Sequence, residues 1–180
     1  MHKVSLISTG GTIEKTYNPL NGVLHNEVSV LDVMLGQMNL NGVKLDRVQL
    51  MNKDSLDMTP RDHELIAFTV EAMLEQHDGV VVVHGTDTLE KTGEVCYQRF
   101  SSGEVNITGP VILTGAMRPY ELRSTDALQN LTEALIAVQI LPPGVYVVMH
   151  NQVLTFPGVT KDREKLCFVR KRLPNEEPTI

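Results

Sequence analysis

Four consecutive valines, Val80–Val83, constrain the fold of this 180-residue chain more than any other feature of its sequence. The run lacks the alternation of polar and apolar residues that a half-exposed strand shows, which is typical of a central parallel strand covered on both faces. Similar apolar runs cover residues 110–114 and 144–149, and helical patterns lie between the runs. Strands that alternate with helices predict βαβ units. We therefore expect an α/β fold whose doubly wound, mostly parallel sheet is flanked by helices.

Local patterns predict the remaining elements. Residues 14–27 lose their periodicity, and Pro19 together with the Asn21-Gly22 pair indicates a tight turn. We therefore expect a flexible N-terminal flap loop, built as a hairpin, in this stretch. We also expect strands over residues 4–8 and 43–51, and helices over residues 28–38, 59–74 (with an apolar stripe from Leu65 to Leu74), 88–100 and 124–138.

The length and the composition limit the class of protein. A chain of this length typically forms one domain, so we expect residues 1–160 to form it and residues 161–180 to be its end and a C-terminal tail, with no second domain. The net charge of −6 and an aromatic content of 4% without tryptophan argue against a nucleic-acid partner. Apolar stretches too short for a membrane span or a signal peptide favour a cytoplasmic protein. Cys96 and Cys167 lie too far apart in sequence to suggest a disulfide framework or a zinc site.

Glycine and polar side chains follow three of the predicted strands. The three segments are Thr9-Gly10-Gly11-Thr12, His84-Gly85-Thr86-Asp87-Thr88 and Gly115-Ala116-Met117-Arg118-Pro119. Ligands of open α/β sheets bind beyond the carboxyl ends of the strands, so these segments are expected to meet at one rim. Glycine lets the backbone approach a ligand and present N–H groups to a negative oxygen. The sequence therefore predicts a small-molecule site at this rim.

The chemistry that these loops offer is nucleophilic and is centred on threonine. A threonine hydroxyl is a poor nucleophile near neutral pH and needs a base nearby. Lys161, once removed from water, is our candidate base, and Asp87 is suited to orient the lysine or to receive a substrate ammonium. A structural interpretation competes with this one, because a threonine after a strand often caps a helix and a Gly-Gly pair often only forms a turn. The residues alone leave the reaction open.

The segments do not occur singly, and together they closely resemble the bacterial-type L-asparaginase family. The resemblance rests on residues 9–13, 84–88 and 115–119, and on Val159-Thr160-Lys161, which is similar to the lysine motif of the family. It covers most of the chain and corresponds to the N-terminal domain of the family, so the chain looks like a short-chain L-asparaginase. The resemblance implies hydrolysis of the side-chain amide of L-asparagine to L-aspartate and ammonia, and more slowly of glutamine. It implies neither a metal nor an organic cofactor.

The resemblance also implies roles for individual residues. Thr12 matches the nucleophile, which forms an acyl-enzyme that water resolves. Thr86, Asp87 and Lys161 match a second constellation, in which Thr86 orients the water or stabilises the oxyanion, Lys161 handles protons and Asp87 also holds the substrate α-ammonium. Tyr17 is the tyrosine of the flap segment, where the family has a tyrosine that assists the nucleophile.

Four further residues match substrate contacts of the family. Ser55 matches the serine that holds the α-carboxylate, and Asp57 keeps the acidic residue of the same loop. Gly11 belongs to the glycine loop at the substrate, and Ala116 would offer a backbone carbonyl to the leaving amide.

Three departures from the family pattern affect what we expect of the site. Tyr17 follows Thr12 more closely than the tyrosine of the family usually does. Leu56 stands where the family commonly has a glutamine that contacts the substrate. The family also takes an acidic residue from its C-terminal domain, supplied by a neighbouring protomer, and Glu14 is the nearest candidate to replace it. We therefore expect an open site with a high Michaelis constant, and a homo-oligomer. The alternatives are a glutaminase or another amidohydrolase on the same scaffold, such as the amidotransferase component used in transfer RNA charging, or a non-catalytic asparagine-binding module.

Overall fold

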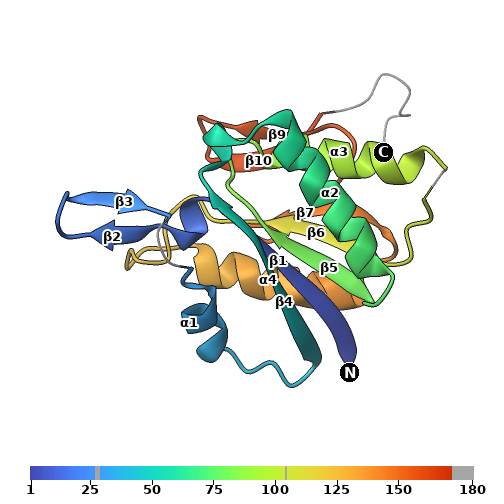
Figure 1. The fold of residues 1–180 in the computed structure, drawn as a ribbon, viewed down its shortest axis with the longest axis horizontal. Helices are drawn as coiled ribbons and strands as arrows, with labels where there is room; N and C mark the ends of the chain where they lie inside the picture. The colour runs from blue at the N-terminus through green and yellow to red at the C-terminus, as the bar shows by residue number, and fades with distance from the viewer. Residues whose placement is uncertain (27–28, 104, 172–180) are drawn as a thin grey trace.

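The computed structural model describes residues 1–26, 29–103 and 105–171, and its centre is a twisted sheet (Figure 1). Within this described part the main sheet has six strands in the order β4-β1-β5-β6-β7-β8. Neighbouring strands pair in parallel from β4 to β7, and β8 pairs antiparallel with β7. The strands are β1 (His2–Gly10), β4 (Val43–Lys53), β5 (Gly79–Val83), β6 (Pro110–Thr114), β7 (Gly144–Met149) and β8 (Gln152–Thr155).

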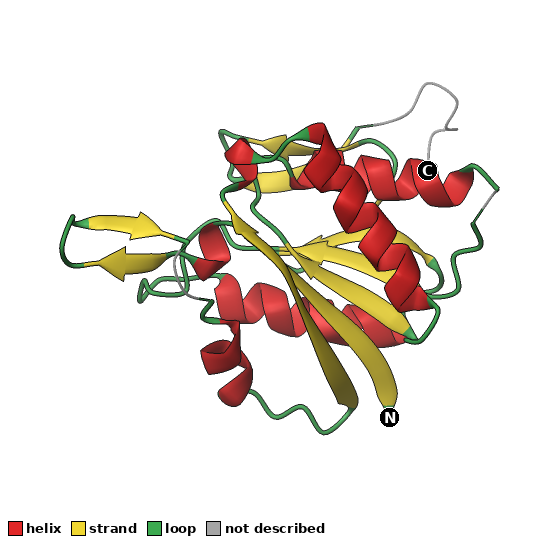
Figure 2. Cartoon of the chain, in the orientation of Figure 1, coloured by secondary structure: helices red, strands yellow, loops and turns green. Residues whose placement is uncertain are grey.

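Helices cover both faces of this sheet, as Figure 2 shows in red against the yellow strands. α2 (Pro60–Leu74) and α3 (Leu89–Ser101) pack on one face, and α1 (Leu31–Gly36) and α4 (Ala127–Ile140) pack on the other. The four valines of β5 serve both layers, because Val81 and Val83 belong to the core with α4 whereas Val80 and Val82 belong to the core with α2 and α3. All four are 0% exposed. The predicted doubly wound α/β fold is therefore confirmed.

The predicted hairpin is present and extends away from the sheet (Figure 1). It consists of β2 (Thr16–Asn18) and β3 (Val23–His25), which pair antiparallel, and Gly22 at its turn has a φ of 75°. Two short 3-10 helices, η1 (Thr12–Glu14) and η2 (Ser55–Asp57), follow β1 and β4. A second two-stranded sheet, formed by β9 (Val159–Asp162) and β10 (Cys167–Arg170), contains the last elements of the described chain.

Two helices begin later than the sequence predicts. α1 begins at Leu31, although the pattern indicated a helix from residue 28, which lies outside the described residues together with residue 27. α4 begins at Ala127 and not near Ser124. The reason is visible at Asp126, whose carboxylate accepts the backbone N–H groups of Met117 and Arg118 and so ties the preceding segment to the loop after β6.

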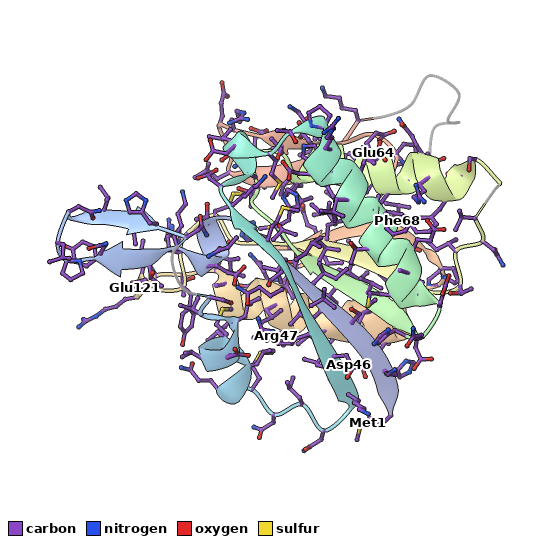
Figure 3. All side chains as sticks on the ribbon, in the orientation of Figure 1. Met1, Asp46, Arg47, Glu64, Phe68 and Glu121 are labelled. Carbon is purple, nitrogen blue, oxygen red and sulfur yellow. The ribbon has the colours of Figure 1, made fainter. Side chains whose placement is uncertain are left out.

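The predicted apolar stripe of α2 is correct except at its first residue. Ile66, Val70 and Leu74 are buried, but Leu65 is 46% exposed. Glu64 and Phe68, labelled on α2 in Figure 3, are also exposed, so the buried face is rotated away from Leu65. Among the described helices, none is long and apolar enough to cross a lipid bilayer.

Candidate active site

The loops after β1, β4 and β5 touch one another through glycine. A Cβ atom placed on Gly11 would lie 2.3 Å from the Cα of Gly85, and one placed on Gly85 would lie 2.6 Å from Ser55 Oγ. The loop after β6 joins the same cluster, because a Cβ on Gly115 would lie 2.3 Å from the carbonyl oxygen of His84. Only glycine permits backbones to approach this closely. The structure thus brings the predicted rim segments into direct contact.

Thr12 stands at the start of η1, immediately after this contact. It is half-buried, and its hydroxyl makes no hydrogen bond with any part of the chain that the structure describes. The peptide groups of Gly11 are both occupied, since its N–H donates to Lys53 O at 2.8 Å and its carbonyl accepts Asn26 Nδ2 at 2.7 Å. Gly11 therefore holds the loop in place with its backbone, and the Thr12 hydroxyl remains available to a ligand.

Thr86, Asp87 and Lys161 lie in one hydrogen-bonded group. Lys161 Nζ donates to Thr86 Oγ1 at 2.8 Å and to Asp87 Oδ1 at 2.9 Å. Burial excludes most water from the pair, because the Lys161 side chain is 8% exposed and Thr86 is 2% exposed. Asp87 Oδ1 also accepts Arg163 Nη1 at 3.1 Å, although the Arg163 side chain is 66% exposed. The group places an ammonium, a hydroxyl and a carboxylate within reach of one another, which is what proton transfer to or from a hydroxyl requires.

β9 carries Lys161 to this rim from a distant part of the sequence. The carboxylate of Glu90, in the first turn of α3, accepts the backbone N–H of Lys161 and fixes the position of β9 relative to the helix. Glu90 was not among the residues predicted from the sequence. The sequence places Glu90 in the first turn of a predicted helix, but no sequence pattern indicates its contact with residue 161.

Ser55 lies in η2, next to Gly85 of the loop that carries Thr86. It is 1% exposed, and its carbonyl accepts the Thr88 hydroxyl at 2.9 Å. Asp54 accepts the N–H of Leu56 at 3.0 Å and so caps η2. The Ser55 side chain consequently faces Gly85, within the cluster of loops.

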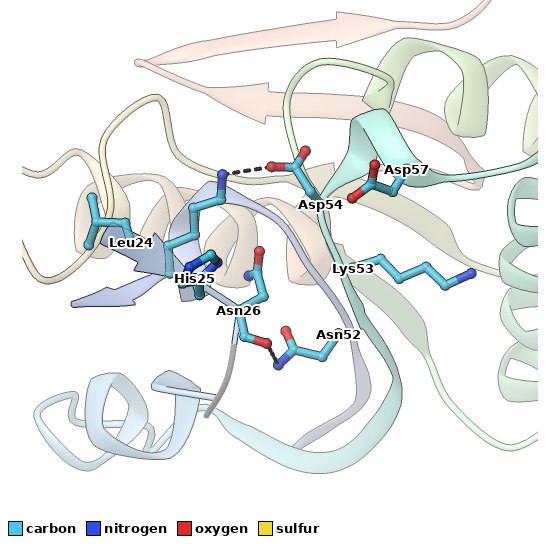
Figure 4. Close-up of a pocket in the computed structure, with 8 residues that line it drawn as sticks. Leu24, His25, Asn26, Asn52, Lys53, Asp54 and Asp57 are labelled. Carbon is cyan, nitrogen blue, oxygen red and sulfur yellow. Dashed lines mark hydrogen bonds and ion pairs between the residues drawn. The ribbon is translucent and has the colours of Figure 1, made fainter. Parts of the chain in front are cut away.

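Asp57 and Ala116 differ in their surroundings. Asp57 is exposed and lines a cavity of about 490 Å³ at the base of the hairpin, which Figure 4 shows. Ala116 is 0% exposed. Its loop is held by Asn130, whose Nδ2 donates to the Gly115 carbonyl at 2.9 Å, and by Asp126. Neither Asn130 nor Asp126 was identified from the sequence.

An ion pair joins the segment after Thr12 to the segment before Ser55. Lys15 Nζ donates to Asp54 Oδ2 at 2.6 Å, drawn as a dashed line in Figure 4. Burial opposes the ionisation of Asp54, but the Lys15 ammonium and the N–H of Leu56 outweigh it and lower the pKa of this carboxyl. The sequence carries one local signal for Asp54, because an aspartate side chain commonly accepts the backbone N–H two residues further along the chain.

Tyr17 does not join the group. It lies on β2 opposite Leu24, is 52% exposed, and makes no hydrogen bond to Thr12 in the described structure. Leu56 is 66% exposed and likewise points away from the buried side of η2. A role for Tyr17 at the nucleophile would require the hairpin to move toward the sheet.

Glu14 is a buried carboxyl that serves the loop and does not face an open site. It is 1% exposed, and its two oxygens accept the N–H of Gly10 at 3.1 Å and the hydroxyl of Ser29. Burial raises the pKa of this carboxyl, against the opposing effect of the Ser29 and Gly10 hydrogen bonds. The suggestion that Glu14 replaces an acidic residue at the nucleophile therefore finds no support in its contacts.

The Glu14→Gln variant is expected to remove part of the pH dependence of stability. A carboxyl with a raised pKa in the folded state stabilises the fold while it is protonated, and this contribution is lost as the pH rises from the unfolded value of 4.5 through the raised folded pKa. Glutamine copies the protonated form, so its free energy of unfolding relative to the wild type should increase as the pH rises through this window. Urea unfolding on both sides of the window measures the difference, with the exposed Glu121→Gln as control. A difference that is constant with pH would contradict the assignment.

The sequence and the fold of the chain are similar to those of known proteins. The structure is similar to that of the thermostable L-asparaginase from Thermococcus kodakarensis, with a TM-score of 0.81 and 27% sequence identity over 99% of this chain and 57% of that one. These similarities place the chain in the class of α/β proteins that share the asparaginase fold. The model of the N-terminal domain of asparaginases matches residues 3–166, and the chain belongs to the asparaginase family.

Relatives of two kinds are among the curated proteins that match the chain. The L-asparaginase of Thermococcus kodakarensis is 28% identical over 159 residues, which are 88% of this chain and 47% of that protein. A glutamyl-tRNA(Gln) amidotransferase component of Pyrobaculum aerophilum is 37% identical over 152 residues, which are 83% of this chain and 35% of that protein. The chain therefore spans about half the length of the first relative and about a third of the second.

Proposed function

We propose that this protein is an L-asparaginase, which hydrolyses the side-chain amide of L-asparagine to L-aspartate and ammonia. The contact of Lys161 Nζ with both Thr86 Oγ1 and Asp87 Oδ1, in a loop that packs against Gly11 next to Thr12, is the observation that carries the proposal. Such a set of a hydroxyl, a lysine and an acid is suited to acyl transfer without a cofactor. The family relationship supports the same reaction.

The proposed reaction has two halves. In the first, the Thr12 oxygen attacks the amide carbon, the hydroxyl proton is taken up, and the amide nitrogen leaves as ammonia after it gains a proton. In the second, water attacks the acyl-enzyme, and its proton returns to Thr12 as L-aspartate is released. Lys161 and Thr86, 2.8 Å apart, provide the path for the proton in our scheme. The Thr86 hydroxyl is our candidate to stabilise the oxyanion.

Recognition of the substrate follows from its two charges. A zwitterionic α-amino acid requires an anion for its ammonium and hydroxyl or N–H donors for its carboxylate. Asp87 is our candidate for the ammonium, although its Oδ1 already accepts Lys161 and Arg163. Ser55, buried next to Gly85, is our candidate for the carboxylate. The partly neutralised Asp87 agrees with the expected high Michaelis constant.

A second candidate function is the deamidation of glutamine. Amidotransferase components that match the chain are 29–37% identical to it, a range that overlaps the 28–33% of the asparaginases, and this similarity makes a glutamine amide the second candidate substrate. The same threonine and lysine chemistry would serve both amides, so the two functions differ only in the length of the side chain that the site accepts.

Ammonia release from L-asparagine and L-glutamine tests the proposal. We expect turnover of asparagine to be faster than that of glutamine, with a Michaelis constant near or above the ~1 mM upper end of the usual range. Hydroxylamine should divert an acyl-enzyme to the β-hydroxamate of aspartate, which mass spectrometry detects. Faster release from glutamine would favour the second candidate. Binding of asparagine without ammonia release would contradict both, and a micromolar Michaelis constant would contradict the open site.

A further inference from the structure

We propose that His84, supported by Thr92 and His63, is a positioning residue that fixes the carbonyl of Gly85 and thereby the three loops of the proposed site. The inference rests on the proposed function for its kinetic consequence. Its structural consequence, that His84 carries its proton on Nδ1, does not depend on any activity.

The three side chains form a continuous buried chain of hydrogen bonds behind the rim. His63 Nδ1 lies 2.7 Å from Thr92 Oγ1, and the same oxygen lies 2.7 Å from His84 Nε2. His84 Nδ1 in turn lies 2.8 Å from the carbonyl oxygen of Gly85. His84 and Thr92 are 0% exposed and His63 is 6% exposed, so water does not compete for these groups. The two imidazole rings lie nearly parallel, with centroids 6.2 Å apart.

The position of each proton in this series of hydrogen bonds follows from its last acceptor, the carbonyl oxygen of Gly85. A carbonyl oxygen only accepts, so His84 Nδ1 must carry the proton that it donates to Gly85. Burial lowers the pKa of His84 to about 4, so the ring is neutral at ordinary pH and its Nε2 is an acceptor. The Thr92 hydroxyl must then donate to His84 Nε2, which leaves the Thr92 oxygen to accept from His63 Nδ1. Each of the three side chains thus has one compatible arrangement.

Gly85 is the point at which this arrangement affects the site. Its backbone packs against both Gly11 and Ser55, at distances that leave no room for a Cβ on either glycine. Thr86 follows it directly, and Thr12 follows Gly11. A rotation of the Gly85 peptide would therefore displace the hydroxyls of Thr12, Ser55 and Thr86 together. The bond from His84 Nδ1 holds this peptide in one orientation.

A pair of near-isosteric variants separates the two bonds of His84. Asparagine places its side-chain nitrogen close to the position of Nδ1, so His84→Asn keeps a donor for Gly85 and loses the contact with Thr92. Glutamine reaches the position of Nε2, so His84→Gln keeps a partner for Thr92 and loses the donor to Gly85. We expect His84→Gln to lower kcat for asparagine by roughly 10- to 100-fold, and at least about fivefold more than His84→Asn does. A residue that only fills the core would give losses that follow the melting temperatures of the two variants and not this order.

The ring nitrogens provide a readout that does not depend on turnover. In protein labelled with ¹⁵N at histidine, we expect one His84 tautomer with the proton on Nδ1, and an Nε2 resonance that shifts in Thr92→Val but much less in Thr92→Ser. A wild-type His84 that carries its proton on Nε2 would overturn the inference. Equal kcat in the two His84 variants would overturn it as well. If no variant and not even the wild type releases ammonia, the proposed function fails, and the ring spectrum still decides the position of the proton.

Discussion

Replacing Lys161 with methionine is expected to lower kcat for asparagine by about a thousandfold or more. Methionine fills most of the buried volume of lysine, which is 8% exposed, but it offers no proton donor or acceptor to Thr86 and no positive charge to Asp87. Loss of a member of a coupled nucleophile and base set typically costs ~10³-fold or more in kcat. Steady-state ammonia release by wild type and variant at matched concentrations measures the ratio.

Lys165 provides a matched control for this experiment. It lies four residues further along the chain, its side chain is 76% exposed, and its only close acid is Asp162 at 3.8 Å within the described structure. Lys165→Met removes the same charge from the protein but should change kcat by less than about threefold, because an exposed ion pair contributes little. If Lys161→Met and Lys165→Met had the same activity, Lys161 would have no role in proton transfer.

Replacing Gly11 with alanine is expected to destabilise the fold by about 3–5 kcal/mol and to abolish turnover. The added Cβ would lie 2.3 Å from Gly85 Cα, which is a backbone atom that cannot turn aside, and the φ of 79° is strained for alanine. The loops that carry Thr12 and Thr86 would have to separate. For a domain of this size the loss corresponds to a decrease of roughly 10 °C in Tm.

Gly22→Ala separates the strain of a positive φ from the steric conflict with a neighbouring backbone. Gly22 has a similar φ of 75°, but a Cβ there would have no neighbour within 4 Å. Gly22→Ala should therefore destabilise the fold only by the backbone strain, about 1 kcal/mol, and it should introduce no steric conflict that lowers turnover. Calorimetry on both variants gives the comparison. Equal losses of Tm would show that the contact of Gly11 with Gly85 does not hold the loops together.

The order of the central elements was predictable because apolar patterning determines which segments are buried. β6 and β7 begin and end at the predicted residues, since both are apolar runs bounded by proline or glycine at their starts. The start of α4 was not predictable, because Asp126 satisfies N–H groups of another loop and not only those of its own helix. Leu65 was assigned to the wrong face of α2 because helical spacing alone does not fix how a stripe is rotated.

The site was predictable in part, from the glycine and hydroxyl residues that end the strands. The loops of Gly11, Gly85 and Gly115 lie together because parallel strands end at one rim, which is a property of the fold. The contacts that cross long stretches of sequence had no local signal, as with Glu90 and the backbone of Lys161. The same holds for the imidazole chain, since no spacing in the sequence indicates that His63 and His84 share the Thr92 hydroxyl. The roles of the site residues stay predictions until they are measured.

The contact of two α-carbons at Gly11 and Gly85 also bears on how this protein tolerates mutation over evolutionary time. The spacing of the Thr12 and Thr86 loops is set by main-chain atoms, whose size does not change when neighbouring residues are substituted. Substitutions of the surrounding side chains therefore leave the backbone spacing of these two loops unchanged. Such a device is consistent with a TM-score of 0.81 at only 27% identity. Gly11 and Gly85 thus preserve the spacing of the two loops while the rest of the sequence diverges.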